Sequence, residues 1–334
     1  MKHFVLIDGH SLLFRAYHGL PKTFTDREGR PVNAVYGFMS MLLRVINDLK
    51  PDFLMVAFDE GAPTLRHADL VTYKEGRPEM DEDLKVQQPI VRELLQSFSV
   101  PTLSIEGYEG EDIIATAIAK IRNQKPAEEK PDGLRSSTRR VGESAGLEFY
   151  IVSGDRDVLQ LVNREVKVYS PKKGISDPVI FDENNVKEVF GVKASAIPDY
   201  KGLRGDPTDR IPGVFGIGEK TAVALIDRFG SIENLYQHIG EVRGPLGEGV
   251  EKKLAEGAEM AVLSKKLATI YSNAPLSITL SQCHYSDFKT NISGLNYLSK
   301  LNFKSLVKRL TGEEMPGKQG QKNKSSDAGQ VPLL

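Results

Sequence analysis

The chain has 334 residues, 40% of them hydrophobic and 27% charged, which suffices for one large globular domain or two smaller ones. Its 44 basic and 45 acidic residues leave a formal net charge of −1, a balance that neither indicates nor excludes a polyanionic partner. The single cysteine excludes an internal disulfide and a thiolate zinc site, and no apolar run is long enough for a signal peptide or a membrane span, so we expect a cytoplasmic protein that binds no membrane.

Short apolar runs alternate with helical patterns along the first half of the chain. Residues 4–7, 53–58 and 149–153 have the composition of buried strands. Residues 34–49 and 83–97 carry apolar side chains at helical spacing instead. The alternation predicts an α/β fold with a mostly parallel sheet and flanking helices.

Breaks in this pattern indicate the domain organisation. Residues 123–147 are polar and lack apolar periodicity, as expected of a mobile surface insertion in a catalytic domain that we place at 1–184. From 185 to 312 the pattern is helical, with glycine and proline punctuation, which predicts a smaller helical region. Residues 313–334 are polar and weakly patterned, so we expect a disordered tail or a linker there.

Acidic residues follow each of the three predicted strands: Asp8, Asp59, and the pair Asp155 and Asp157. In a parallel sheet the carboxyl ends of the strands share one rim, where open α/β folds place their ligands. We therefore expect these carboxylates to converge in one crevice.

Two further segments contribute five more carboxylates. Glu109, Glu111 and Asp112 open a predicted helix, where the helix dipole favours negative charge. Asp206 and Asp209 stand in a glycine- and proline-containing turn. The alternative interpretations are an ordinary helix start and an ordinary Asp-rich turn.

Nine carboxylates in one crevice would repel one another unless cations were bound. Ligand sets made only of oxygen select hard ions such as Mg²⁺ or Mn²⁺. Two such ions about 4 Å apart are a known device for phosphodiester cleavage, in which one activates water and the other stabilises the leaving oxygen. The histidines show no metal-ligand spacing, and we interpret His10 and His67 as supports of local structure.

A basic segment follows Asp59. Arg66, Lys74 and Arg77 could hold phosphates, and Tyr73 could stack on an unpaired base. A solvated charged helix is the alternative interpretation of the same residues.

A glycine hairpin enters a predicted helix further along the chain. Gly213, Gly216 and Gly218 would let phosphate approach backbone N–H groups, and Lys220 adds positive charge. Glu219 occupies the position that a P-loop reserves for lysine, so a nucleotide site is excluded. We predict a hairpin that grips a DNA backbone, with an ordinary helix-linking turn as the alternative.

Taken in chain order, these motifs resemble the 5′ nuclease superfamily, and most closely the 5′-3′ exonuclease domain of bacterial DNA polymerase I. The resemblance extends from about residue 3 to residue 312 through these segments: Ile7-Asp8-Gly9-His10, Phe14-Arg15-Ala16-Tyr17, Phe58-Asp59, Arg66-His67, Tyr73-Lys74, Gly107-Tyr108-Glu109, Asp155-Arg156-Asp157, Gly205-Asp206, Asp209 and the hairpin from Gly213 to Thr221.

The resemblance implies a PIN-like α/β domain, a helical arch over the active site and a helix–three-turn–helix element that grips duplex DNA. By matching positions, two metal regions would be served by two sets of carboxylates: Asp8, Asp59, Glu109, Glu111 and Asp112 in the first, and Asp155, Asp157, Asp206 and Asp209 in the second. The arch residues Arg66, Tyr73, Lys74 and Arg77 would orient the scissile phosphate and the unpaired end.

DNA contacts are implied for two further groups. One is the pair Arg15 and Tyr17, and the other is the hairpin through Lys220 and Thr221, which in the family can also hold a potassium ion through backbone carbonyls. The implied substrates are flapped, nicked and RNA-primed DNA in replication and repair, with a separate or fused polymerase as partner and a monomeric enzyme.

The chain departs from the family pattern at three positions: Gly110 and Glu111, in the run Glu109-Gly110-Glu111-Asp112 that replaces Glu-Ala-Asp-Asp, and Arg210, which replaces the usual Asn. Two alternative functions remain: a PIN-like ribonuclease, against which the glycine hairpin counts, and a non-catalytic branched-DNA binder, against which the retained carboxylates count.

Overall fold

The structure is a computed structural model that describes residues 1–61, 63–124, 146–171, 178–242 and 247–312. Most of the predicted insertion and the whole predicted tail lie outside these residues. Within them, no helix is both long and apolar enough to cross a bilayer.

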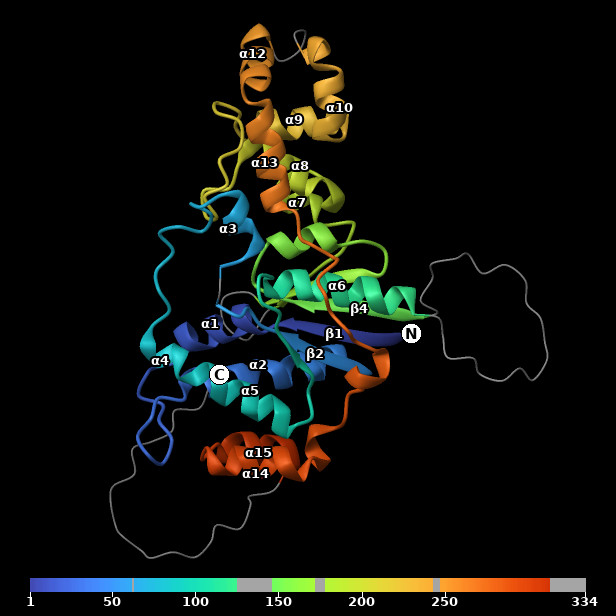
Figure 1. Cartoon of the computed structure of the whole chain (residues 1–334). Coiled ribbons are helices and arrows are strands. Elements are labelled where there is room, and N and C mark those ends of the chain that lie inside the picture. The colour runs from blue at the N-terminus through green and yellow to red at the C-terminus, as the bar shows by residue number, and fades with distance from the viewer. Residues whose placement is uncertain (62, 125–145, 172–177, 243–246, 313–334) are drawn as a thin grey trace, which may run out of the picture.

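A six-stranded sheet forms the centre of the molecule (Figure 1), in the order β3-β2-β1-β4-β5-β6. Its strands are β1 (Lys2–Asp8), β2 (Phe53–Ala57), β3 (Thr102–Leu103), β4 (Leu147–Val152), β5 (Val166–Pro171) and β6 (Pro178–Phe181). All neighbouring pairs are parallel except β5 and β6, so the predicted mostly parallel sheet is confirmed. Ile7 is level with Val56 and Val152, which brings the acidic ends of three strands to one rim.

Helices cover both faces of the sheet. On one face Val5 and Ile7 pack with α1 (Gly9–Gly19), α2 (Asn33–Leu49) and α5 (Gln87–Ser97), and on the other Phe4 and Leu6 pack with α6 (Gly110–Asn123). Successive strand residues point to opposite faces, and here both faces are buried. This explains why the strands are continuous apolar runs without polar alternation.

The helices of the C-terminal half lie largely above the sheet in the view of Figure 1: α7 (Lys187–Phe190), α8 (Ile197–Arg204), α9 (Glu219–Phe229), α10 (Ile232–Gln237), α12 (Glu248–Glu256) and α13 (Ala258–Ala268). Short 3-10 helices connect parts of the chain: η1 (Asp157–Leu161), η2 (Ala194–Ala196), η3 (Ile239–Val242), η4 (Leu280–Cys283) and η5 (Phe288–Thr290). The apolar core beside α6 continues into α8 and α9, so side chains from both sides of the predicted boundary near 184 pack together. The boundary itself stays a prediction.

The last two helices, α14 (Ile292–Lys300) and α15 (Lys304–Thr311), lie below the sheet beside α2 and α5 (Figure 1). The ring centroids of Phe98 and Phe288 are 4.3 Å apart, and those of Tyr36 and Phe303 are 5.2 Å apart. The stretch expected to form one helical region is therefore divided in space, because its final apolar residues complete the core on the α2 and α5 side.

The segment expected to form a helical arch contains only two short helices, α3 (Leu65–Asp69) and α4 (Glu82–Lys85), with turns between them. Lys74 and Gly76 have left-handed backbone conformations, and Pro78 disfavours a helical Arg77, so a longer helix cannot form here. The helix predicted at 83–97 is divided between α4 and α5, because Pro89 cannot donate the hydrogen bond that would continue it.

Candidate active site

Asp8 stands at the centre of the carboxyl rim. It is the N-cap of α1, and its carboxylate accepts hydrogen bonds from the Ser11 N–H at 2.9 Å and from Ser153 Oγ at 2.8 Å. Ser153 Oγ in turn accepts the N–H of Asp155 at 3.0 Å. Sequence reasoning missed both serines, although the spacing from Asp8 to Ser11 is that of an N-cap and its third helical residue.

The negative charge on Asp8 is poorly compensated. Burial raises the pKa of Asp8 to about 7 against the hydrogen bond from Ser11, and the nearby charges of Asp59 and Asp155 add to the rise. The structure thus brings together the acids that follow three different strands, as the parallel topology predicts.

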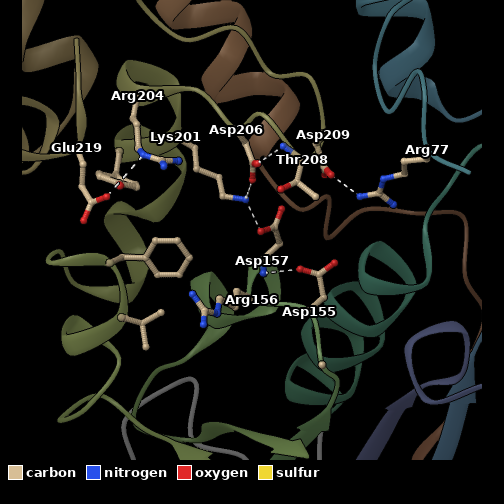
Figure 2. A pocket seen from close by; sticks show the side chains of 14 residues that line it. Arg77, Asp155, Arg156, Asp157, Lys201, Arg204, Asp206, Thr208, Asp209 and Glu219 are labelled. Atoms are coloured by element: carbon tan, nitrogen blue, oxygen red, sulfur yellow. Dashed lines mark hydrogen bonds and ion pairs between the residues drawn. The ribbon is translucent and has the colours of Figure 1, made fainter. Parts of the chain in front are cut away.

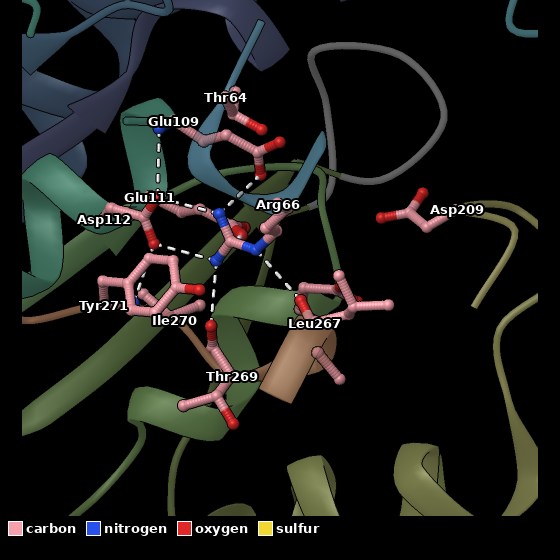
Figure 3. Close-up of polar contacts among 12 residues, drawn as sticks. Thr64, Arg66, Glu109, Glu111, Asp112, Asp209, Leu267, Thr269, Ile270 and Tyr271 are labelled. Carbon is pink, nitrogen blue, oxygen red and sulfur yellow. Dashed lines mark hydrogen bonds and ion pairs between the residues drawn. The ribbon is translucent and has the colours of Figure 1, made fainter. Parts of the chain in front are cut away.

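The start of α6 is dominated by one buried ion pair (Figure 3). Both Asp112 oxygens accept hydrogen bonds from the Arg66 guanidinium, at 2.8 and 2.9 Å, and Arg66 is only 1% exposed. The remaining Arg66 N–H groups donate to the carbonyls of Leu267 and Thr269. Arg66 therefore ties α3 to α6 and α13, and it does not reach the open crevice where a phosphate would lie, contrary to the expectation from sequence.

Asp112 is occupied in the same way. Besides Arg66, its two oxygens accept the backbone N–H groups of Glu109 and Tyr271, so all four lone-pair sites of the carboxylate are used. The expectation that Asp112 ligates a metal is corrected by this geometry, because a ligand needs a free lone pair.

Glu109 and Glu111 differ from Asp112. Burial alone would raise the pKa of Glu109, but the charges of Lys74 and Arg66 hold this pKa below its usual range. Burial and then the charge of Glu109 raise the pKa of Glu111 well above its usual range, and Asp155 contributes. Arg66 Nη2 lies 3.7 Å from Glu111 Oε1 and compensates only part of the charge of this second buried carboxylate.

Two cations of the turn segment point into the crevice. Lys74 Nζ is 2.7 Å from Glu109 Oε1, and Arg77 forms an ion pair with Asp209. The backbone N–H of Lys74 also donates to the carbonyl of Asp209 at 3.0 Å, which ties the turn to the far side of the crevice. The expected role of both side chains in orienting a phosphate stays a prediction.

Tyr73 is buried, in contrast to its neighbours. Its ring packs against Ile211, Leu267 and Ala268, and its hydroxyl lies 3.5 Å from Glu109 Oε2. Stacking of Tyr73 on an unpaired base, as expected from sequence, does not fit this placement because no face of the ring is open.

The second set of carboxylates surrounds a buried lysine (Figure 2). Lys201, on α8, is 3% exposed and donates to Asp206 Oδ2 at 2.7 Å and to Asp157 Oδ1. Burial raises the pKa of Asp157 to about 6 against the charge of Lys201, and Asp155 adds to the rise. Sequence reasoning missed Lys201, which shares α8 with the charged residues Asp199 and Arg204, so no local pattern marked it as buried.

The structure tests whether the acids could share one ion. Among the described residues, no three acidic, histidine or cysteine side chains stand close enough together to hold a metal. Lys201, Lys74 and Arg77 instead neutralise part of the set, while Asp8 and Glu111 stay short of positive charge. Oxygen-only donors with uncompensated negative charge fit hard divalent cations.

The glycine hairpin between α8 and α9 is shaped by close backbone approach. Gly205 and Gly213 both have positive φ, and a Cβ on either would collide with backbone atoms of the facing strand. The N–H of Gly213 donates to Ser264 Oγ at 2.9 Å, so this buried glycine serves packing and does not contact phosphate as expected. Phe215 at the tip is 95% exposed.

The exposed part of the hairpin matches the expectation better. Gly216 and Gly218 are exposed, and Gly218 is the N-cap of α9, whose first turn holds the exposed Lys220 and the half-buried Thr221. The carbonyl of Gly216 accepts a hydrogen bond from Lys253 Nζ at 3.3 Å.

The two predicted DNA contacts on α1 differ from each other. Tyr17 is buried and its hydroxyl donates to Asp81 at 2.6 Å, so it anchors the turn segment and does not face a ligand. Arg15 is half-buried and lies beside Gly154, at the edge of the crevice.

Two histidines, His10 and His67, lie near the crevice. His67 Nδ1 accepts the N–H of Thr64 at 3.1 Å and so completes the cap of α3, in keeping with the support role expected for it. His10 Nδ1 is 3.7 Å from Asp59 Oδ2, too far for a hydrogen bond.

Comparison with known proteins places this site in context. Residues 3–130 match the family model of the 5′-3′ exonuclease N-terminal resolvase-like domain, and residues 192–291 match that of the 5′-3′ exonuclease C-terminal SAM fold. DNA polymerase I of Caldicellulosiruptor bescii is 37% identical over 308 residues, which are 92% of this chain and 33% of that protein. DNA polymerase I of Bacillus subtilis is 37% identical over 320 residues, 96% of this chain and 33% of that protein.

The chain thus spans about one third of the length of the curated relatives it matches. Among solved structures, a T5 5′-exonuclease with bound divalent metal ions (zinc) has a TM-score of 0.60 at 19% identity, covering 91% of this chain and 98% of that chain. The catalytic core of Rad2 in complex with a DNA substrate has a TM-score of 0.52 at 16% identity, covering 94% and 88%. The fold, both family models and the polymerase relatives agree, and the chain belongs to the 5′-3′ exonuclease family.

Proposed function

We propose that the chain is a metal-dependent, structure-specific 5′ nuclease that hydrolyses phosphodiester bonds at 5′ flaps, at nicks and at RNA primers on DNA. The observation that carries this function is the rim at which Asp8, Asp59 and Asp155 meet, with the charge of Asp8 left uncompensated. Membership of the exonuclease family gives the reaction class.

Eight of the nine predicted acids would serve as metal ligands, directly or through water, once divalent ions bind: Asp8, Asp59, Glu109, Glu111, Asp155, Asp157, Asp206 and Asp209. The ninth, Asp112, positions the start of α6 through Arg66. Two bound divalent ions, Mg²⁺ or Mn²⁺, would activate water and stabilise the leaving oxygen. A relative of the same fold was crystallised with divalent metal ions, which is in keeping with this role.

Lys74 and Arg77 would act on the substrate. Each now pairs with a carboxylate, Glu109 or Asp209, at the border of the crevice. A phosphate between them would offer both cations a second anionic partner, so they can stabilise the charge that develops on the phosphate in the transition state.

The duplex part of the substrate would lie against the hairpin and the start of α9. Gly216, Gly218, Lys220 and Thr221 present exposed backbone or side-chain donors at a helix N-terminus, which favours phosphate. A potassium ion at the hairpin carbonyls would have to displace Lys253 from Gly216. Arg15 lies on the opposite side of the crevice, beside Gly154, and can contact the cut strand there.

The relatives are polymerases about three times as long as the matched segment. We infer a polymerase partner, fused or separate, and a monomeric nuclease unit in the reducing cytoplasm. Residues 1–184 would form the catalytic domain and the following helices the duplex-binding region.

The test is cleavage of three 5′-labelled substrates in parallel: a flap, a nicked duplex and single-stranded RNA, each with magnesium or with EDTA. We expect cutting of the first two in magnesium only, at the junction of single and double strand. Preferential cutting of the RNA would instead support the ribonuclease alternative, and binding without cleavage would support a non-catalytic DNA binder.

A further inference from the structure

A cavity of about 470 Å³ opens beside the second set of carboxylates. On its acidic side it is lined by Asp155, Asp157 and Asp206, and on the other side by Arg156 and Arg204 (Figure 2). Neither arginine has a part in the site described so far.

Arg156 stands between two acids but pairs with neither. It precedes η1 in a right-handed backbone conformation, and its guanidinium points away from Asp155 in Figure 2. Arg156 is exposed, and its side chain makes no hydrogen bond or ion pair with any described residue. An unpaired planar guanidinium inside a cavity is available to a ligand, and oxyanions match its geometry.

Arg204 supplies a second open guanidinium. It is the last residue of α8, and its contacts are weak: 3.4 Å to the carbonyl of Gly205 and 4.0 Å to Glu219 Oε2. In Figure 2, Arg204 lies above and Arg156 below the Lys201 ammonium. Lys201 is already held by Asp157 and Asp206, and Arg77, which also lines the cavity, is paired with Asp209. Among the described residues that line the cavity, Arg156 and Arg204 are therefore the cations most open to an incoming anion.

The position of the cavity indicates which anion enters it. Arg77 and Asp209 line one side of the cavity, and Arg204 and Glu219 line the other side, next to α8 and the start of α9. Helix α8 leads into the hairpin and α9, where the duplex would be held. A strand whose scissile phosphate lies at the carboxylates would therefore place its neighbouring phosphate, on the duplex side, in this cavity.

We propose that Arg156 and Arg204 bind the phosphodiester next to the scissile one on the duplex side of the cut strand. The proposal rests on the nuclease function and adds to it how the cut strand is positioned along the carboxylates. When the neighbouring phosphate is held, only one phosphodiester can lie over the carboxylates. The two arginines would thus decide at which bond the strand is cut.

The experiment combines protein variants with a neutral backbone. Flap substrates carry a single methylphosphonate linkage at successive positions on the duplex side of the cut, and cleavage is followed in single-turnover conditions with magnesium. The enzymes are the wild type, Arg156→Ala, Arg156→Lys and Arg204→Ala. Arg164→Ala is the matched control, because Arg164 is exposed in the turn before β5, at the opposite edge of the sheet, and pairs with no described residue.

We expect the neutral linkage at the first position to slow the wild type by about tenfold to hundredfold, as for one charge-assisted hydrogen-bonded contact. Arg156→Ala should also be slowed on the natural backbone, and the neutral linkage should slow it less than it slows the wild type, since only the Arg204 contact is left to lose. This variant should also cut at more than one bond, Arg156→Lys should recover part of the rate, and Arg164→Ala should equal the wild type.

Several results would overturn the subsite. These are additive effects of Arg156→Ala and the neutral linkage, a strongest effect at another linkage, or an unchanged cutting position in both alanine variants. Failure of the nuclease function is a separate outcome, seen when the wild type leaves natural flaps intact. In that case binding of the same substrates in EDTA still tests the subsite, which predicts weaker wild-type binding to the first-position linkage and a smaller difference for Arg156→Ala.

Discussion

Two buried cations, Arg66 and Lys201, stand in acidic surroundings and do different things. Arg66 makes a two-pronged contact to Asp112 and also donates to backbone carbonyls, so every group in its network is used. The Lys201 ammonium donates one hydrogen bond to an oxygen of Asp157 and one to an oxygen of Asp206. An ammonium is a single-point charge that a metal ion can replace, whereas a guanidinium fork is fixed by geometry. We therefore expect the Arg66 cluster to stabilise the fold, and the Lys201 ammonium to be replaceable by a metal ion.

This difference shows that acidic residues of equal prominence in the sequence need not share a role. Asp112 has no lone pair left for a metal, while Asp157 has its second oxygen free of any hydrogen bond to a described residue. The following predictions test the contrast, from the largest expected effect to the smallest.

The largest effect on activity is expected when carboxylates around Lys201 are removed. Asp155→Asn combined with Asp157→Asn should abolish magnesium-dependent flap cleavage, because both carboxylates are proposed metal ligands. Flap binding should persist or tighten, since negative charge near the phosphates is lost. Cleavage and fluorescence anisotropy measure the two quantities, and turnover near the wild-type rate would remove this pair from the site.

The second prediction compares the two cations directly. Arg66→Met leaves Asp112 buried without its partner and should lower the free energy of unfolding by about 3–5 kcal/mol. Most of this loss should persist in magnesium, because only Glu109 and Glu111, which also pair with Arg66, are open to a metal ion. Lys201→Met should destabilise the protein in EDTA but less in magnesium, because a bound divalent ion can neutralise Asp157 and Asp206. Denaturant unfolding in both buffers measures this difference, and equal magnesium rescue of both variants would contradict the contrast.

The third prediction concerns the turn between the clusters. Lys74→Ala and Arg77→Ala should each raise the barrier by about 3 kcal/mol, or about a hundredfold in rate, if these cations stabilise the transition state. Single-turnover cleavage with enzyme in excess removes binding and product release from the comparison. If both variants cut within about threefold of the wild type, the side chains act only through long-range attraction.

The smallest effect is expected in the pH dependence of stability. The pKa of Asp8 is raised to about 7 in the metal-free fold, so the folded state releases this proton less readily than the unfolded chain. The contribution of Asp8 to stability in EDTA should therefore be fully present below the unfolded pKa and be lost as pH rises towards 7. Thermal unfolding between pH 5 and 8 measures this, with Asp8→Asn expected to flatten the profile. A wild-type profile as flat as that of Asp8→Asn would show that Asp8 is already ionised and compensated.

The sequence by itself determined the sheet and the rim. Apolar runs that end in Asp8, Asp59 and Asp155 are local patterns, and the rule that parallel strands share a carboxyl edge converts them into one place in space. The glycine hairpin was also predictable from a local pattern. Closely spaced glycines are needed where the backbone has positive φ or where another backbone segment approaches closely.

Only the tertiary structure decided which of these side chains are free to act. Arg66 is satisfied by the carbonyl of Leu267, 201 residues away, and Tyr73 is covered by Ile211 and its neighbours. Lys201 reaches Asp157 across 44 residues. Whether a charge is compensated, saturated or left open depends on desolvation and on partners that are distant in the chain, and neither residue type nor local spacing carries that information.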